Sequence, residues 1–403
     1  MALNLLRNAR LFVTTSSGTT GLDDDNTWEI PLLSDFSFSQ AAETTDITVS
    51  EAGATPTRGG LRFSTALNPV DWSFSTYMRP YKINALATNV STRNEHRCLE
   101  RILWHGLVSA NNVNFAATGG NADAKATSTT SFDIVTTGSN VHRFTTLYLL
   151  IKADNVWYRI AGVQVNQAEV DFGIDTIGQI TWSGFGTTMT KLASAPTTTG
   201  SLVKEYSSPT VLTGNSTATA LDMDFVIQKY TRLTITDNRN TNGHTAQAYT
   251  LPITGGTLTF NNNITYLTPE TLGIVNTPIG SFTGSREITG SVSAYLKTGT
   301  AGDAGDLLED LLGFTSETTT SYKVDFVAGG VANTDPTVQF VMNNCHVSIP
   351  TVDVQDVLSV NIDFKATPYS GSGASTTGDL TFSNELSVKY IAINATSSTS
   401  NDN

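Results

Sequence analysis

Apolar and polar residues alternate along much of the chain. The segment 71–79 reads DWSFSTYMR, and the segment 360–365 reads VNIDFK. Successive side chains of a β-strand point to opposite faces, so this period of two predicts strands with one buried face. The same reasoning predicts strands at 11–15, 30–40, 61–64, 146–152, 322–327 and 386–391. The chain is therefore predicted to be mainly β.

Two segments instead repeat their apolar residues with the spacing of a helix. The apolar stripe consists of Cys98, Leu99, Ile102 and Leu103 in 94–107, and of Leu307, Leu308, Leu311 and Leu312 in 303–313. Asp303 or Asp306 can cap the start of the second segment. We expect one short helix in each half of the chain.

One long β-pattern occurs twice. Residues 158–184 match residues 340–366 without a gap, at a constant shift of 182. Val170 then falls on Val352, Asp171 on Asp353 and Trp182 on Phe364. Only four of the 27 pairs are identical, so the match depends on whether neighbouring elements recur in the same order.

The neighbouring elements do recur in that order. Four further matches are 10–14 with 232–236, 30–32 with 251–253, 36–39 with 258–261, and 72–80 with 290–298. The last match places Ser73 on Ser291 and Tyr77 on Tyr295, and a predicted helix follows each copy. The pattern indicates a tandem duplication.

The duplication divides the chain into two β-domains. We predict a first domain at 1–192, a linker at 193–222, a second domain at 223–368 and a C-terminal extension at 369–403. The linker and the start of the extension are rich in Ser, Thr and Gly, as linkers commonly are. The first domain carries an insertion at 108–145, rich in Ala, Asn, Thr, Gly and Ser, which is typical of a surface loop.

Charge and composition narrow the possible functions. The 403 residues carry a formal net charge of −13, and no cluster of Lys or Arg with interleaved aromatic residues occurs, so tight binding of phosphates is not expected. No apolar run is long enough to span a membrane, and the N-terminus lacks the pattern of a secretory signal. Cys98 and Cys345 are expected to be buried thiols rather than a disulfide.

Candidate chemistry is sparse. His96, Cys98 and His105 come nearest to a metal site, but nine residues on one helix separate the two histidines too widely for one ion. The acidic residues of the repeated segment are Asp171, Asp175, Asp353 and Asp363. They are expected on the polar face of alternating strands, without a cleft or a perturbed partner for acid–base catalysis. We predict no catalytic, cofactor-binding or metal-binding residue, and no enzymatic activity.

The arrangement resembles the tail tube protein of long-tailed bacteriophages. The resemblance lies in a β-rich unit with one short helix, a long surface loop and a closing pair of strands that ends in small residues, here ITWSGFG at 180–186. It implies two tandem tube domains of the β-sandwich or barrel type. Duplicated members of this family build a ring from three chains instead of six, and the repeat fits that variant.

The resemblance also implies a location and partners. Rings would stack into the hollow tail tube of the virion, assembled in the host cytoplasm, through which phage DNA passes. Partners would be other copies of the chain, the tape measure, baseplate and terminator proteins, and possibly a sheath. The implied lumen wall is acidic, with Asp171, Asp175, Asp353 and Asp363 as candidate residues. The loop 108–145 and the N-terminal arm are candidates for contacts between rings.

Three other interpretations stay open. A baseplate hub protein also forms a trimeric ring with two tube-like domains, but it does not polymerise, so growth into long tubes separates the two. A Thr-, Ser- and Asn-rich β protein could instead be an adhesin or carbohydrate-binding module, which binding to a glycan array would favour. A glycosidase with two acidic residues is the remaining alternative, and hydrolysis of polysaccharides would support it.

Overall fold

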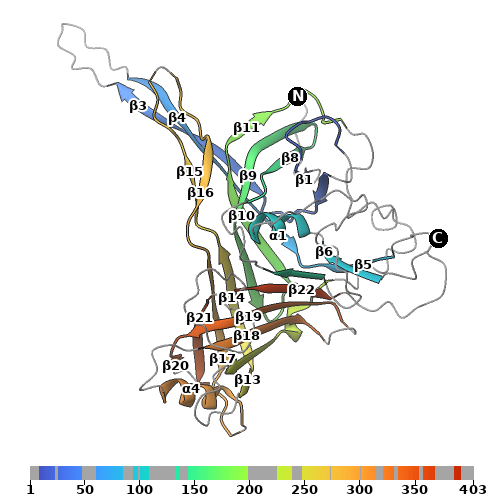
Figure 1. Cartoon of the computed structure of the whole chain (residues 1–403), viewed down its shortest axis with the longest axis vertical. Helices are drawn as coiled ribbons and strands as arrows, with labels where there is room; N and C mark the ends of the chain where they lie inside the picture. Colours follow the sequence, from blue (N-terminus) through green and yellow to red (C-terminus); the bar gives the residue numbers. More distant parts are fainter. Residues whose placement is uncertain are drawn as a thin grey trace.

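The computed structural model is built mainly of antiparallel strands (Figure 1). It describes residues 9–22, 26–47, 60–84, 94–98, 100–108, 132–135, 144–197, 225–237, 247–272, 274–299, 301–313, 321–330, 335–353, 357–367 and 385–391. The prediction of a mainly-β fold is confirmed. The predicted linker 193–222 and the first part of the extension 369–403 lie largely outside the described residues.

The first half of the chain forms a run of neighbouring strands. Their order is β2 (Thr27–Ile30), β1 (Ala9–Thr14), β8 (Leu147–Ala153), β9 (Val156–Gly173), β10 (Gln179–Gly186), β4 (Leu61–Tyr77) and β3 (Ser37–Ile47), with β11 (Thr188–Lys191) also paired to β9. The segments 61–64 and 71–79, predicted as separate strands, belong to the single strand β4. Alternating residues of these strands are buried, as the period of two requires.

The second half repeats this order. It runs β13 (Ala248–Leu251), β12 (Arg232–Asp237), β18 (Tyr322–Gly329), β19 (Thr337–Val347), β21 (Ser359–Ala366), β17 (Glu287–Tyr295) and β14 (Ile253–Asn261), and β20 (Thr351–Asp353) also pairs with β21. A short 3-10 helix, η2 (Gln228–Tyr230), precedes it.

Strand β14 joins the two halves into one sheet. It pairs with β17 on one side and with β9 of the first half on the other, so that Leu258 lies opposite Val170. The apolar face under this junction forms one continuous core, in which Phe172 stacks on Phe326 with ring centroids 5.0 Å apart. Asn262 is buried just after β14 and donates to the carbonyl oxygens of Leu107 and Val165.

Both predicted helices occur among the described residues, and each is shorter than its predicted segment. Helix α4 (Ala304–Leu312) is capped by Asp303, whose side chain accepts from the backbone N–H groups of Gly305 and Asp306, as predicted. Helix α1 (Arg101–Val108) starts later than expected, because residues 94–98 form strand β6 (Asn94–Cys98), paired with β5 (Pro80–Asn84). None of the described helices has the length and hydropathy of a membrane span.

The last strand connects the extension to both halves. Strand β22 (Ser387–Ile391) pairs with β19 on one side and with β7 (Phe132–Val135) on the other. The insertion 108–145 therefore contains a strand that the sequence did not predict, while its residues 109–131 and 136–143 lie outside the described ones. The Tyr390 hydroxyl donates to Glu100 and accepts from the Trp104 indole, both buried.

Two hairpins project from the body as arms (Figure 1). The first arm consists of the outer parts of β3 and β4, residues 42–47 and 61–67, and the second arm of β15 (Ile264–Leu267) and β16 (Gly280–Thr283). The arms lie side by side, because the Leu67 N–H donates to the Asn276 carbonyl and the Asn276 N–H to that of Thr65. Both arms expose large apolar side chains, including Leu61 and Leu272.

A glycine on β10 permits the close approach of three strands in the first half. A Cβ atom on Gly184 would lie 2.2 Å from the Gln164 carbonyl oxygen and 2.6 Å from the Trp72 ring. We expect Gly184→Ala to lower the free energy of unfolding by about 1–3 kcal/mol, since backbone must move. Gly280→Ala is the control, because no atom lies within 4 Å of its Cβ position. Equal denaturation midpoints for the two variants would contradict the prediction.

Candidate functional site

The sheet presents a polar face opposite its core. One cross-strand row on it runs Asp171, Thr257, Ser291 and Asp363, each directly opposite the next on β9, β14, β17 and β21. Residues directly opposite each other on antiparallel strands share a face. The row crosses from the first half into the second without interruption.

Two parallel rows extend the polar face. One runs Ser75, Thr181, Glu169, Thr259, Thr289, Lys365 and His346, and the other Ser37, Ser73, Ser183, Gln167, Asn261 and Glu287. Most of these side chains are hydroxyls and amides. Over the three rows, four carboxylates, of Asp171, Asp363, Glu169 and Glu287, stand against the single ammonium group of Lys365.

Lys365 is paired within the polar face. Its Nζ donates to Glu287 Oε1 at 2.7 Å, and this hydrogen bond holds the pKa of Glu287 below its ordinary value. Both side chains are about half exposed, so the pair is screened by solvent and adds little to stability. The ion pair neutralises the carboxylate of Glu287 on the polar face.

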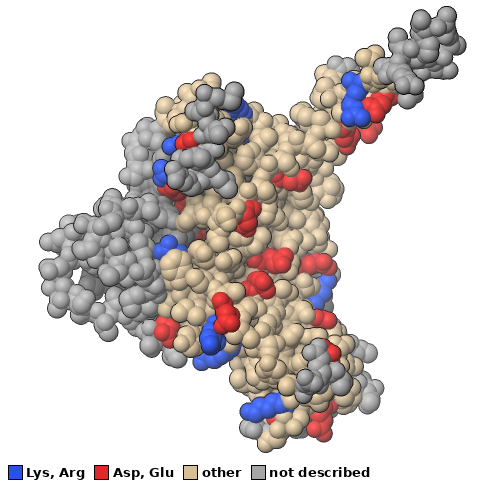
Figure 2. Space-filling view, turned by 180° about the vertical axis from the view of Figure 1, so that it is seen from behind, with Lys and Arg blue, Asp and Glu red and all other residues tan. Residues whose placement is uncertain are grey.

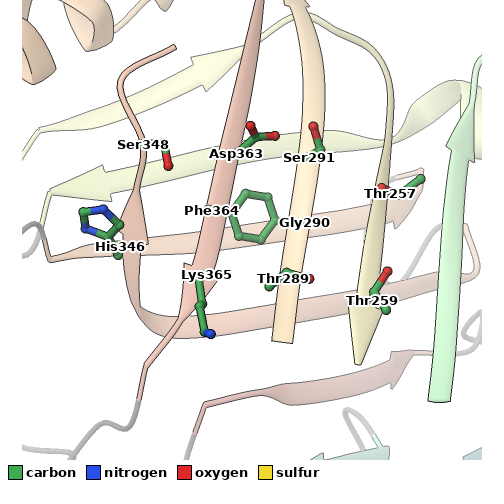
Figure 3. Close-up of a pocket in the computed structure, with 10 residues that line it drawn as sticks. All are labelled: Thr257, Thr259, Thr289, Gly290, Ser291, His346, Ser348, Asp363, Phe364 and Lys365. Atoms are coloured by element: carbon green, nitrogen blue, oxygen red, sulfur yellow. The ribbon is translucent and has the colours of Figure 1, made fainter. Parts of the chain in front are cut away.

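A shallow groove crosses the second-half part of the polar face. Its volume is about 370 Å³, and Figure 3 shows its polar lining on neighbouring strands. The lining includes Thr257, Thr259, Thr289, Ser291, His346, Ser348, Asp363 and Lys365. A comparable groove of about 290 Å³ in the first half is lined by Ser37, Ser39, Asp71, Ser73 and Ser183 among others.

The polar face is weakly acidic and rich in hydroxyl and amide groups. Figure 2 shows one side of the molecule, where acidic side chains are spread down the central body and basic ones are fewer. Such a surface repels phosphates and offers hydroxyls for water-mediated contact. Among the residues that the structure describes, no group of three His, Cys, Asp or Glu side chains could hold a metal ion.

The structure brings two of the four predicted acidic residues into one row. Asp171 and Asp363 are exposed at the two ends of the row that crosses the junction. Asp353 is exposed on the edge strand β20. Asp175 lies in the turn between β9 and β10, so its predicted place on the polar face of a strand is wrong.

Other charged residues of the face were missed. Glu169 lies two residues before Asp171 and could have been found from the period of two alone. Glu287 and Lys365 become neighbours only through the pairing of β17 with β21, which no local pattern reveals. The metal candidates do not share one helix as predicted, because His96 lies on β6 and His105 is buried in α1. Burial lowers the pKa of His105 to about 3.

Among the described residues, strands β3 and β20 each have an unpaired edge. Strand β3 pairs only with β4, and β20 only with β21. Apolar side chains are exposed beside the second edge, with Val352 43% and Ile349 58% accessible. Unpaired N–H and C=O groups next to exposed apolar side chains favour pairing with another chain.

Comparison with known proteins identifies one relative with coverage of nearly the whole chain. The tail tube protein pb6 of Escherichia phage T5 is 37% identical over 386 residues, which cover 96% of this chain and 77% of pb6. No family profile matches the chain.

Lys365→Ser tests the ion pair on the polar face. We expect the pKa of Glu287 to rise towards its ordinary value, measured by NMR titration of the carboxyl carbon. Stability that the pair supplies is present above the ordinary pKa of Glu287 and is lost as the pH falls, so the variant should lose that pH dependence. Lys191→Ser, on exposed β11, should leave Glu287 unchanged. A Glu287 titration identical in the two variants would count against the pairing.

Proposed function

The chain belongs to the bacteriophage tail tube proteins, and from this we propose that three copies form a ring and that rings stack into the hollow tail tube. Its role is structural rather than enzymatic, and its place is the tail of the virion. Phage DNA would pass through the channel. Partners would be further copies of the chain and other tail proteins, including the tape measure, baseplate and terminator proteins.

A duplication of one tube domain, at 1–192 and 223–368, is supported by strand register. In the first half Leu11 lies opposite Ile30, and in the second half Leu233 lies opposite Leu251. These are the residues that the sequence repeat matches. The second partners of these strands are also equivalent, because β1 pairs with β8 on its other side and β12 pairs with β18. A tandem duplication predicts that both the sequence pattern and the strand register occur twice.

Two of the sequence matches need a correction of two residues. Phe364 pairs with Val347 and Gly290, whereas Val165, the equivalent of Val347, pairs with Gly184, which lies opposite Trp72. Gly184 rather than Trp182 therefore corresponds to Phe364, and Trp72 corresponds to Gly290 as in the sequence match. Because Phe38 lies opposite Trp72 and Leu258 lies opposite Gly290, Phe38 rather than Phe36 corresponds to Leu258. A shift of two keeps every side chain on its own face, so the alternating pattern alone could not detect it.

Ring closure is supported by the relation between two of the unpaired edges, those of β3 and β20. Strand β14 corresponds to β3, and the part of β9 that pairs with β14 corresponds to β20. Within one chain β14 pairs with β9, whereas their counterparts β3 and β20 each have an unpaired edge among the described residues. We propose that β3 of one chain pairs with β20 of the next in the register of the junction, with Phe38 opposite Val352.

Burial differs between the junction and its vacant counterpart, and this difference carries the proposal. Leu258 and Val170 are 3% and 2% exposed in the junction. Their equivalents, Phe38 and Val352, are half-buried and 43% exposed, respectively. The same positions are apolar in both copies, as expected if a neighbouring chain covers the second pair. Burying such side chains drives association.

Stacking of rings would use the projecting arms. Leu61, Leu272, Ile274 and Ile279 are each more than 60% exposed there. A projecting apolar surface of this kind favours a protein partner. The earlier candidates for this contact, the loop 108–145 and the first residues of the chain, lie mostly outside the described residues.

Val352→Asp tests ring closure. Val352 is 43% exposed in the single chain, so the variant should fold normally, with a denaturation midpoint near that of the wild type. In the ring the new carboxylate would be buried opposite Phe38, which costs several kcal/mol. We expect rings and tubes to disappear from negative-stain images, and native mass spectra to show single chains.

Leu312→Asp is the matched control, because Leu312 is 58% exposed at the end of α4, a helix that contacts β13 through Asp310 and Tyr249. It should assemble like the wild type. Tubes from Val352→Asp would contradict the edge pairing. A wild-type trimer that never elongates would favour the hub interpretation, and a wild-type protein that stays a single chain would reopen the carbohydrate-binding one.

Reversing the charge of Asp171, Asp175, Asp353 and Asp363 to Lys tests the acidic channel wall. All four carboxylates are exposed, so we expect tubes to form while DNA ejection from phage particles slows, since phosphates would be attracted to the wall. Glu309→Lys, an exposed charge on α4, is the control. Ejection at the wild-type rate in the fourfold variant would remove these residues from the wall.

A further inference from the structure

Residues 225–231, here called the lead-in of β12, pack on the first half at the turn between β9 and β10. They precede β12 directly, and Val226 among them is fully buried. The Val226 carbonyl accepts from the Gly178 N–H at 2.7 Å, and Ile227 forms an antiparallel bridge with Ile177. The lead-in therefore joins the two halves in addition to the pairing of β14 with β9.

Phe225 of the lead-in packs against two side chains at the end of β4 and just beyond it. Its ring meets the Tyr77 ring edge-on, with the centroids 5.4 Å apart. The Arg79 guanidinium lies 4.7 Å from the centroid of the Phe225 ring. Aromatic and cation–π contacts of this kind add to the stabilisation from buried area alone.

The surface that receives Phe225 has a counterpart in the second half. The match of β4 with β17 places Tyr77 on Tyr295 and Arg79 on Lys297. An aromatic side chain followed two residues later by a cation therefore stands at both places.

A backbone hydrogen bond extends this equivalence to the turn. The Met78 N–H donates to the Gly178 carbonyl at 2.8 Å, and the Leu296 N–H donates to the Leu358 carbonyl at 3.0 Å. Because Leu296 is the equivalent of Met78, Leu358 is the equivalent of Gly178. The surface so defined, called the docking surface below, consists of Tyr295, Lys297, Val357 and Leu358.

The docking surface is uncovered in the single chain. Tyr295 is 48% exposed, Leu358 42% and Val357 61%, and Lys297 is exposed as well. In the first half, by contrast, Tyr77 is half-buried beside the lead-in. No backbone carbonyl of the described residues accepts from the Leu358 N–H, whereas the equivalent N–H in the first half is bonded to the lead-in.

We propose that residues 1–8 of a neighbouring copy of this chain bind to the docking surface. The inference rests on the ring proposed above, and it adds a second contact to each joint between chains. Residues 1–8, which lie outside the described residues, precede β1 as the lead-in precedes β12. Since β1 and β12 are equivalent strands, residues 1–8 are the counterpart of the lead-in.

The sequence of residues 1–8 suits the docking surface. Leu3 precedes Leu11 by eight residues, as Phe225 precedes Leu233, the equivalent of Leu11. Leu3 would therefore lie against the aromatic ring and the cation of the docking surface, as an apolar side chain in place of Phe225. Burying these apolar groups drives association.

The next position differs between the halves in a compensating way. By the same count Val226 falls on Asn4, and Leu358 stands where the first half has Gly178. A Cβ atom on Gly178 would lie 3.3 Å from the Val226 Cβ, so a side chain at this position points at the lead-in. Leu358 can therefore supply the apolar bulk that Val226 supplies in the first half. The Asn4 carbonyl can still accept from the Leu358 N–H, since a backbone hydrogen bond needs no particular side chain.

The occupant comes from another copy of the chain. Strands β1 and β20 lie at opposite ends of the body (Figure 1), and β20 adjoins the docking surface through its pairing with β21. In the proposed ring, β3 of the next chain pairs with β20 as β14 pairs with β9 inside one chain. The same relation between halves brings residues 1–8 of that chain to the docking surface. Edge pairing and docking surface thus require the same neighbour, although they rest on different residues.

Cross-linking of assembled tubes tests the docking surface. We expect Leu3→Cys/Tyr295→Cys tubes treated with a short bismaleimide to give a ladder of covalent multimers on a denaturing gel, ending at the number of chains in the ring. The matched in-chain variant is Tyr77→Cys/Phe225→Cys, which should give a cross-linked peptide within a single chain, because these two rings are in contact. The native Cys98 and Cys345 are buried and should not react.

The outcomes separate the docking surface from the ring itself. Tubes in which Tyr77→Cys/Phe225→Cys links but Leu3→Cys/Tyr295→Cys does not would overturn the docking surface and leave the ring standing. A link only within single chains, or multimers larger than the ring, would also overturn the proposal, because the occupant would then be the same chain or a chain of another ring. Failure of the wild type to form rings would instead overturn the proposed function. Each single-cysteine variant must form tubes without multimers, which shows that the ladder requires both positions.

Discussion

The antiparallel pairing of β14 with β9 is the interaction on which the rest of the structure depends. It converts two groups of strands into one sheet, carries the polar rows from Asp171 to Asp363, and closes a single core in which Phe172 meets Phe326. Because hydrogen bonds between strands fix direction and register together, this contact also fixes how one half stands to the other. If the equivalent strands of two chains pair in the same way, the two chains take the same relative orientation as the two halves.

Much of the fold could be predicted from alternation and repetition. The period of two predicted most strands, and the duplicated order of elements predicted which strands would have equivalent neighbours. Pairing partners distant in sequence could not be predicted locally, which is why β7 and the ion pair of Lys365 with Glu287 were missed. The two-residue error that matched Phe364 with Trp182 instead of Gly184 has the same origin, since a periodic pattern cannot distinguish its own repeats.

The candidate site was predicted less completely than the fold. Asp171 and Asp363 were placed correctly on a polar face, but Asp175 was not, because a turn interrupts the alternation after β9. The polar face is spread over strands from both halves, so no single segment of the sequence shows its acidic and hydroxyl-rich composition. The repeat itself was the most informative signal, since comparing equivalent positions shows which of them lack a covering partner, as Val352 does beside Val170.

Strand β22 has a consequence for synthesis of the protein. It pairs with β19 and with β7, a strand about 250 residues earlier, and Tyr390 contacts Trp104 and Glu100. A ribosome must therefore translate past residue 391 before the first half gains this contact. Contacts so distant in sequence form late in folding. A nascent or truncated chain would lack them, so only fully translated molecules could present completed surfaces to a growing polymer.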